Sequence, residues 1–256
     1  MIIVGEIMKN YKHTLFQSFG DKLYYYEKID STNNVAKGME VWEHGTIIVA
    51  TTQTAGRGTF GRTFYSSTGS GIYMSLVLDL KEWHFKQTQL TTIYTAVLVC
   101  DAIEAVTGIS PDIKWVNDLF VNRRKIGGIL TEMDTTSNKL IIGIGINLTG
   151  EKEDFPEEIK HIVDSLGLKS SVDKQAAAIV TKIYDTIIRP KTLVDEKTVL
   201  RRYKERLFIL DEMIEVNQGG KTFQARVIDV NEAGYLIVSC DGKELSLSVG
   251  EVKIKV

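Results

Sequence analysis

The pattern of apolar residues changes near Phe208, and this change constrains the fold more than any other feature of the chain. Before it, β-branched apolar runs alternate with segments of helical periodicity. After it, short apolar runs are separated by turn residues such as Asp241 and Gly242, with no helical pattern. Regularly spaced short strands are typical of a small β-barrel. We therefore predict an α+β protein with a mixed α/β domain over residues 1–208 and a small β domain over residues 209–256.

Hydrophobic periodicity places the elements of the larger domain. Residues 46–52 and 71–80 are apolar and rich in β-branched side chains, which favours buried strands. Over residues 89–106 the apolar side chains recur at spacings of three and four, as on one face of an amphipathic helix. The same reasoning predicts strands over residues 113–121, 126–132 and 139–148 and helices over residues 32–42, 174–188 and 195–208.

Composition and charge exclude several classes of protein. The 256 residues are 43% hydrophobic and 25% charged, as in an ordinary globular chain, and 31 Lys and Arg against 33 Asp and Glu lack the basic excess of a duplex-DNA binder. Cys100 and Cys240 are too far apart for a CxxC pair and indicate free thiols in a reducing compartment. The start of the chain lacks a signal-peptide pattern, and no run approaches the ~18 apolar residues that span a bilayer. We expect a cytoplasmic protein without a membrane partner.

A glycine-rich segment lies between the first two predicted strands. Gly56, Gly58 and Gly61 match GxGxxG, but the segment leads into a strand, whereas a dinucleotide fingerprint opens a helix, and the chain has no kinase motifs to follow it. Glycines allow close backbone approach, and Arg57 and Arg62 add permanent charge, so the segment suits a phosphate or carboxylate cradle. The alternative is a flexible hairpin loop with two solvated arginines.

A second polar cluster surrounds the predicted strand pair at 113–132. Lys114, Asn117 and Asp118 place a cation, an amide and a carboxylate within five residues, and the basic triple Arg123-Arg124-Lys125 follows. If the strands form a hairpin, Lys114 and Lys125 converge on one ligand and Asp118 helps to hold a divalent cation or a polar group. Fixed cations suit a reaction in which a carboxylate attacks a phosphate. The alternative is a polar turn with solvated basic residues, which we prefer for Arg123 and Arg124.

Two shorter motifs are also candidates for a binding site. In the apolar run at residues 141–148, Gly143 and Gly145 remove alternate side chains and leave room for a flat ring, although tight packing explains them equally well. The triplet at residues 31–33 suits a helix N-cap, which uses only one of its side-chain oxygens and leaves the others free for a polar ligand.

Taken in order, these motifs resemble those of the biotin protein ligases. They are STN at 31–33, QTAGRGTFGRTF at 53–64, KWVNDL at 114–119, RKIGGIL at 124–130 and GIGIN at 143–147. The resemblance covers nearly the whole chain and implies a catalytic domain of the biotin/lipoate ligase type with a C-terminal SH3-like β domain. It also implies a two-step reaction. Biotin and MgATP give biotinyl-5'-AMP and pyrophosphate, and a lysine of a biotin carboxyl carrier protein then takes the biotinyl group.

The resemblance also implies a role for each matching residue. Lys125, Arg57 and Lys114 are the expected catalytic residues, with Lys125 bridging the biotin carboxylate and the α-phosphate. The expected biotin-binding residues are Ser31, Thr32, Asn33, Gln53, Gly56, Arg57, Gly58, Thr59, Lys125 and Gly127. The expected nucleotide-binding residues are Arg62, Phe64, Lys114, Asn117 and Asn147, and Asp118 is the expected magnesium ligand.

Three positions depart from the family pattern. Thr59 stands where the family often has Arg, which removes a charge and a forked donor from the loop that shields the acyl-adenylate. Phe64 replaces a frequent Trp but can still cover a pocket, and Val116 replaces Pro between intact neighbours. The ligase motifs begin by residue 31, so we expect no amino-terminal helix-turn-helix domain and no DNA binding.

Other functions are compatible with parts of the pattern. A lipoate or octanoyl transferase shares a related fold but is not expected to carry the GRGxxGR loop. A non-catalytic biotin or nucleotide sensor, or a small nucleic-acid binder built on the C-terminal β domain, would leave the catalytic cluster unexplained. An edge strand is able to serve homodimer formation or carrier docking, and the sequence does not decide between them.

Overall fold

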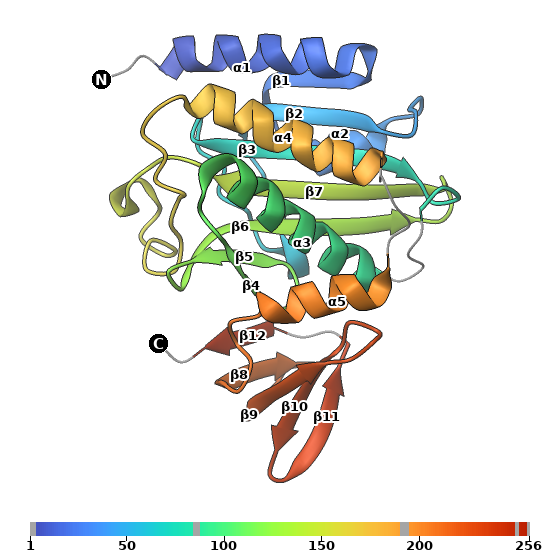
Figure 1. Ribbon diagram of the computed structural model, residues 1–256, viewed down its shortest axis with the longest axis vertical. Coiled ribbons are helices and arrows are strands. Elements are labelled where there is room, and N and C mark those ends of the chain that lie inside the picture. The colour runs from blue at the N-terminus through green and yellow to red at the C-terminus, as the bar shows by residue number, and fades with distance from the viewer. Residues whose placement is uncertain (1–3, 84–87, 190–194, 249–250, 255–256) are drawn as a thin grey trace.

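The computed structural model describes residues 4–83, 88–189, 195–248 and 251–254 and contains two β-sheets (Figure 1). The described helices are α1 (Val4–Phe19), α2 (Thr32–Gly38), α3 (Thr88–Thr107), α4 (Val172–Ile188) and α5 (Glu196–Glu205), with 3-10 turns at Gly20–Lys22, Thr59–Gly61 and Lys152–Asp154. The large sheet contains β1 (Leu23–Ile29), β2 (Thr46–Gln53), β3 (Gly71–Asp79), β4 (Asp112–Lys114), β5 (Asp118–Val121), β6 (Arg124–Asp134) and β7 (Lys139–Asn147). The small sheet contains β8 (Met213–Gln218), β9 (Lys221–Val230), β10 (Leu236–Cys240), β11 (Lys243–Leu247) and β12 (Glu251–Ile254).

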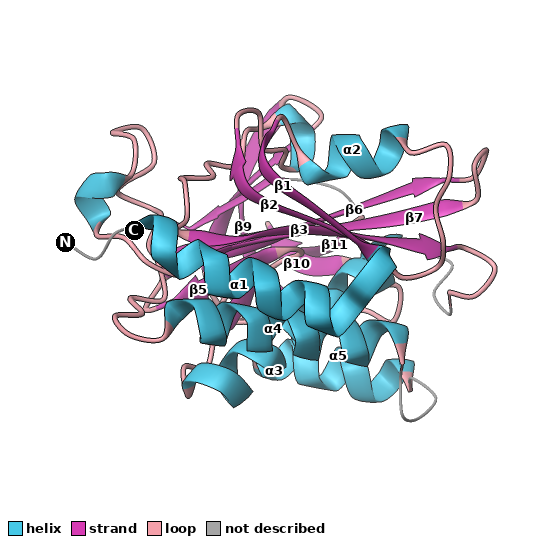
Figure 2. Ribbon diagram, turned by 90° about the horizontal axis from the view of Figure 1, so that it is seen from above, coloured by secondary structure: helices cyan, strands magenta, loops and turns pink. Residues whose placement is uncertain are grey.

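The large sheet is covered by helices on both faces. Its strand order is β1-β2-β3-β7-β6-β5-β4, and only the β1–β2 pair is parallel. Figure 2 shows α2 on one side of this sheet and α1, α3 and α4 on the other. Because both faces are covered, the central strands β3 and β7 are buried along almost their whole length, which explains their continuous apolar sequences.

The sequence predicted most of these elements, with three differences. The predicted strand at 113–121 is two short strands, β4 and β5, joined by a tight turn, and the helix predicted over 32–42 ends at Gly38. Helix α1 was not predicted, although Tyr11, Leu15 and Phe19 recur at spacings of four and are buried. This spacing was not recognised in the sequence, because the apolar residues of α1 are separated by polar ones. The apolar face packs against α4.

Helix α3 is the most apolar helix of the described chain. By length and composition alone it could cross a membrane, contrary to the expectation from the sequence, and no other described helix meets that criterion. In the fold, 61% of its hydrophobic stretch is buried, and it packs against β6, α4 and α5. A helix that is apolar on all sides and covered by protein is a core helix, so the predicted amphipathic pattern with one buried face is wrong for α3, in which every residue from Thr91 to Cys100 is buried.

The small sheet is antiparallel throughout, in the order β11-β10-β9-β8-β12. No described pairing joins β11 to β12, so the predicted barrel is an open five-stranded sheet over the described residues. It contacts the large domain at the turn between β9 and β10, where the carbonyl of Gly234 accepts a hydrogen bond from Trp115 Nε1 (3.0 Å). We propose a domain boundary at 208/209, because Leu207 forms a β-bridge with Ile113 of the large sheet.

Burial separates the two cysteines by reactivity. Cys100 on α3 is fully buried, and this burial raises the pKa of its thiol to about 12, whereas Cys240 is half-buried. Since the thiolate is the nucleophile, Cys100 stays protonated and unreactive at pH 8. We expect Ellman's reagent to label one thiol in the folded protein and two in urea, and a Cys240→Ser variant to show no native labelling. Equal labelling of both thiols before unfolding would contradict this assignment.

Candidate functional site

A cavity of about 180 Å³ opens on the face of the large sheet that α2 covers. Strands β6 and β7 form its floor, the N-terminus of α2 and the end of β2 form one side, and the segment after β2 forms another. All of the predicted site residues except Gly56 and Lys114 line it, namely Ser31, Thr32, Asn33, Gln53, Arg57, Gly58, Thr59, Arg62, Phe64, Asn117, Asp118, Lys125, Gly127 and Asn147.

The alternation of side chains along the strands decides where this cavity begins. On β7, residues with odd numbers face α2, and Ile141 packs with Val77 and Ala36 in a small apolar cluster beneath that helix. The next positions on the same face are Gly143 and Gly145. The apolar floor therefore ends where the side chains disappear, and polar groups from other elements take their place.

The spaces beside the two glycines of β7 are filled by the protein's own side chains. A Cβ at Gly143 would lie 2.1 Å from Asn33 Oδ1, and a Cβ at Gly145 would lie 2.6 Å from the Phe64 ring. Of the two interpretations from the sequence, tight packing is therefore confirmed: the Phe64 ring fills the space at position 145, and the Asn33 amide fills the space at position 143. Asn147, two residues further on, is 5% exposed and donates from Nδ2 to the carbonyl of Asp164 (3.0 Å).

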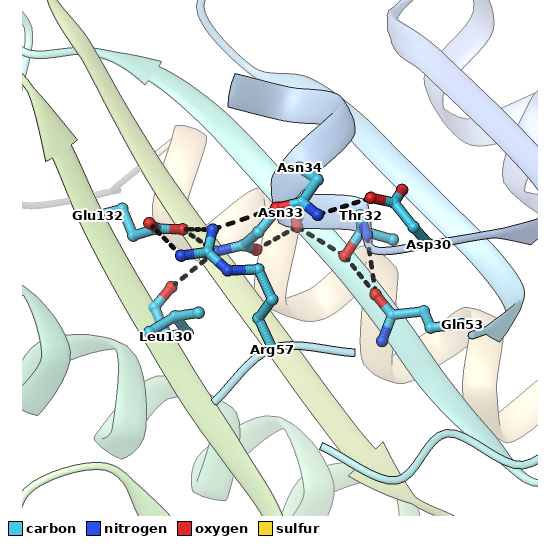
Figure 3. A network of polar contacts seen from close by, with 9 residues as sticks. Asp30, Thr32, Asn33, Asn34, Gln53, Arg57, Leu130 and Glu132 are labelled. Carbon is cyan, nitrogen blue, oxygen red and sulfur yellow. Dashed lines mark hydrogen bonds and ion pairs between the residues drawn. The ribbon is translucent and has the colours of Figure 1, made fainter. Parts of the chain in front are cut away.

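The N-terminus of α2 contributes a connected set of polar groups (Figure 3). The backbone N–H of Thr32 donates to Gln53 Oε1 (2.8 Å), and the Thr32 hydroxyl donates to the same oxygen (3.2 Å). The buried Ser75 hydroxyl donates to Asn33 Oδ1 (2.6 Å), while Asn33 Nδ2 donates to Glu132 Oε2 (3.0 Å). The Asn33 amide is thus fixed on both sides, since each of its polar atoms has a protein partner.

Ser31 precedes α2 and differs from an ordinary cap. Its backbone is extended, as at an N-cap, but its side chain makes no cap hydrogen bond. The residue is 2% exposed and lines the cavity. Its hydroxyl is accordingly available to a ligand in the cavity, which is the outcome that the sequence left open.

The glycine-rich segment is an ordered hairpin rather than a flexible loop. Gly58 N–H donates to the Arg62 carbonyl and Phe64 N–H donates to the Gly56 carbonyl, both at 2.8 Å. Phe60 at its tip has φ +57° and is exposed. Gly56 lies behind the cavity wall, because a Cβ there would be 2.4 Å from the Phe64 carbonyl oxygen. Its glycine is required by packing within the hairpin.

Two of the three cationic side chains that line the cavity, Arg57 and Lys125, are each paired with a carboxylate. Arg57 binds Glu132 through both terminal nitrogens, at 2.8 and 3.0 Å. Lys125 Nζ lies 2.6 Å from Asp118 Oδ1, and both of these side chains are mostly buried. These pairs fix the positions of the positive charges before any ligand enters.

Lys114 does not share the main cavity with Lys125. It lines an adjoining cavity of about 170 Å³, which also includes Ser248 and Val252 from the C-terminal end of the chain. Asp118, opposite Lys114 in the β4–β5 pairing, lines both cavities. The predicted convergence on a single spot is therefore replaced by two neighbouring cavities that share Asp118.

The segment after β7 returns over the cavity and is held by Arg124. This side chain donates to the carbonyls of His161 and Val163, at 3.0 Å each, and pairs with Asp164 at 3.2 Å. The preferred interpretation of Arg124 as a solvated residue is wrong, because the returning segment supplies carbonyl partners that the local sequence does not reveal. Arg123 is 63% exposed, as that interpretation predicted, and pairs with Glu212.

Several residues at the site were not predicted. Ser75 and Glu132 join the polar network, and Ile159, Ile162 and Val163 line the cavity from the returning segment. A hydroxyl inside the apolar run at 71–80 was a usable signal for Ser75. The three apolar residues had no such signal, since their place depends on the path of the chain after β7.

A magnesium ion fits this site only together with a phosphate ligand. The described residues contain no group of three His, Cys, Asp or Glu side chains that could hold a metal. Asp118 is the one carboxylate of the predicted set, and Lys125 already contacts it. Mg²⁺ often binds through one or two carboxylates plus substrate phosphates, so Asp118 is compatible with that mode.

Comparison with known proteins gives one consistent family. The model of the biotin/lipoate A/B protein ligase family matches residues 25–148. The bifunctional ligase/repressor BirA of Bacillus spizizenii is 40% identical over 169 residues, which cover 64% of this chain and 52% of that protein. The biotin--[acetyl-CoA-carboxylase] ligase of Mycobacterium tuberculosis is 21% identical over 227 residues, which cover 87% of this chain and 83% of that protein. The chain thus spans about half the length of the BirA relative that it matches.

Solved structures agree with the sequence comparison. A variant of the biotin protein ligase from Aquifex aeolicus, in complex with biotin, superposes with a TM-score of 0.76 at 26% identity and covers 91% of this chain and 98% of its own. The same enzyme in complex with biotin and ATP gives a TM-score of 0.74 at 24% identity, with 92% and 100% covered. The mixed α/β architecture with a C-terminal antiparallel sheet is shared with these proteins.

The contact between Gly143 and Asn33 predicts that an alanine substitution at Gly143 destabilises the protein much more than one at Gly128. Gly143→Ala forces the buried Asn33 amide aside, so we expect the free energy of unfolding to fall by about 1–3 kcal/mol. Gly128→Ala is the control, because its Cβ would meet Asp118 Oδ1 at an ordinary 3.5 Å. Urea unfolding followed by tryptophan fluorescence measures both. Equal losses in the two variants would show that Asn33 does not limit this position.

Proposed function

We propose that this chain is an ATP-dependent biotin protein ligase, because residues 25–148 match the model of the biotin/lipoate A/B protein ligase family. In the first step the biotin carboxylate attacks the α-phosphate of ATP, which gives biotinyl-5'-AMP and releases pyrophosphate. In the second, a lysine amine of a biotin carboxyl carrier domain attacks the acyl carbon and releases AMP. The observation that carries this proposal is one cavity with buried polar groups at one end and a fixed cation at the other.

The polar end suits the ureido head of biotin. We assign Ser31, Thr32 and Gln53 to it, since their hydroxyl and amide groups lie at the cavity wall among apolar neighbours. Gly58 and Gly127 give the ligand access to backbone on either side. A site built for hydrogen bonding rejects analogues that lack the matching groups, because its buried polar atoms would then stay unpaired.

Lys125 is assigned to the first step and to the acyl transfer. Two unit charges 4 Å apart interact by about 4 kcal/mol at an effective dielectric constant of 20, so a carboxylate approaching a phosphate meets a barrier of that order. A lysine at the same distance from both anions contributes two attractions of that size and more than offsets the repulsion. Asp118 holds the amine in place beforehand, so little reorganisation is needed.

The adjoining cavity suits the polyphosphate side of the nucleotide. Lys114 and Arg62 line it, and Asn117 and Asp118 lie on its border with the main cavity. We assign Arg62, Phe64, Lys114, Asn117 and Asn147 to the nucleotide and Asp118 to the magnesium that accompanies its phosphates. The metal would neutralise charge on the phosphates when it is bound.

The partner and compartment follow from the same proposal. We expect the acceptor to be a biotin carboxyl carrier domain, because the M. tuberculosis relative is named as a biotin--[acetyl-CoA-carboxylase] ligase. Two free thiols support a reducing cytoplasmic compartment. Strand β1 is an edge of the large sheet, and strand addition there is the route we propose for carrier docking or for a second copy of the chain.

Intact-mass spectrometry tests the proposed function directly. With biotin, MgATP and a carrier domain, we expect the carrier to gain one biotinyl group, and without carrier we expect bound biotinyl-5'-AMP. The family also includes lipoate ligases, so lipoate replaces biotin in a parallel reaction. Lipoylation without biotinylation would select that alternative, and tight biotin binding without any adenylate would indicate a sensor.

Lys125→Ala separates the cation from the fold. We expect biotin-dependent ATP–pyrophosphate exchange and carrier labelling both to fall by about 10²–10³, because the fixed charge is lost from both transition states. Lys169→Ala is the control, since Lys169 is 74% exposed and pairs only with Glu151 among the described ion pairs. Turnover of Lys125→Ala within a factor of about three of the control would remove Lys125 from the mechanism.

A further inference from the structure

Glu132 lies at one end of the polar network beside the cavity and contacts both Arg57 and Asn33 (Figure 3). Its Oε2 accepts hydrogen bonds from Arg57 Nη1 (2.8 Å) and from Asn33 Nδ2 (3.0 Å), and its Oε1 accepts from Arg57 Nη2 (3.0 Å). Its side chain is 22% exposed and is not part of the cavity lining. Glu132 therefore joins two site residues while staying behind the wall.

Glu132 fixes the orientation of the Asn33 amide. Ser75 donates to the amide oxygen, and Glu132 accepts from the amide nitrogen. A flipped amide would place its oxygen against the carboxylate and its nitrogen against the Ser75 hydroxyl, which loses the favourable pairing with Glu132. Asn33 is in turn fixed against Gly143, so the first turn of α2 is tied to the sheet.

Glu132 also ties the glycine-rich hairpin to strand β6. The guanidinium of Arg57 binds both carboxylate oxygens, and two parallel charge-assisted bonds fix direction as well as distance. Gly58 and Thr59, the next two residues, line the cavity. Arg57 Nη1 also donates to Asn34 Oδ1 of α2, at 3.3 Å. Before the hairpin, the N–H groups of Thr54 and Ala55 donate to the carbonyls of Ile29 and Asp30, whereas the described backbone hydrogen bonds between Gly56 and Phe64 lie within the hairpin.

We propose that Glu132 is a positioning residue that holds the hairpin wall and the first turn of α2 in the geometry that binds the substrate head group. It acts through Arg57 and Asn33 and does not touch the substrate. In this arrangement the guanidinium of Arg57 is a clamp on β6, and Lys125 is the cation that meets the reacting anions. The identity of the substrate rests on the proposed function, whereas the clamp itself does not.

Glu132→Gln tests the clamp, since it preserves size and removes the charge. In the ligand-free protein we expect the amides of Gly58 and Phe64 to exchange hydrogen at least about tenfold faster, because a charge-assisted pair is lost. In the ligase assay we expect the KM for biotin to rise about tenfold, with kcat and the KM for ATP within about threefold of wild type. Glu205→Gln, which removes a surface ion pair on α5, is the control for both measurements.

A double-mutant cycle distinguishes a clamp from two independent roles. If Arg57 acts through Glu132, the variant with both Arg57→Gln and Glu132→Gln binds biotin no worse than the weaker single variant. If the fold-losses in biotin affinity of the two single variants multiply in the double variant, Arg57 contacts the ligand independently and the proposal is overturned. Unchanged hydrogen exchange in Glu132→Gln would overturn it as well, whatever the substrate proves to be. If the wild-type protein shows no biotin-dependent ATP–pyrophosphate exchange, only the proposed function is rejected.

Discussion

The site depends on two positions of β7 that carry no side chain. Alternate residues of a strand face the same side, so Gly143 and Gly145 open adjacent spaces on the face that α2 covers. Asn33 enters one space and Phe64 the other, from elements more than twenty residues apart. Without these openings, neither the first turn of α2 nor the glycine-rich hairpin could lie against the sheet, and the cavity between them would not form.

Charge pairing complements this steric arrangement. Arg57 and Lys125 lie near the same cavity, and each is held by its own carboxylate, Glu132 and Asp118. A partly buried cation without a partner would be costly, and on flexible side chains it would also be poorly placed. Paired cations keep their positions, so Arg57 holds the hairpin wall and entering anions meet a Lys125 charge that is already oriented.

The two domains meet beside the second cavity. Trp115, next to Lys114, donates its indole N–H to the carbonyl of Gly234, in the turn between β9 and β10 of the small sheet. Gly234 has φ +81° and packs against Ile93 of α3, where a Cβ would lie 2.8 Å from the Ile93 side chain. The small sheet thus supports the turn that carries the polar residues after β4, which gives the C-terminal strands a direct connection to the site.

The sequence by itself determined most of the element types, with α1 as the exception, the change of architecture near Phe208 and most of the residues that line the cavity. Periodicity and local residue chemistry carry this information, because burial of one face imposes a spacing along the chain. It did not determine that Lys114 faces a separate cavity, that Arg124 binds the returning segment, or that Ser75 and Glu132 orient the site. Those outcomes depend on which strands become neighbours and on where the chain passes after β7. They are contacts between distant segments, and no local pattern encodes the partner of a side chain that lies about one hundred residues away.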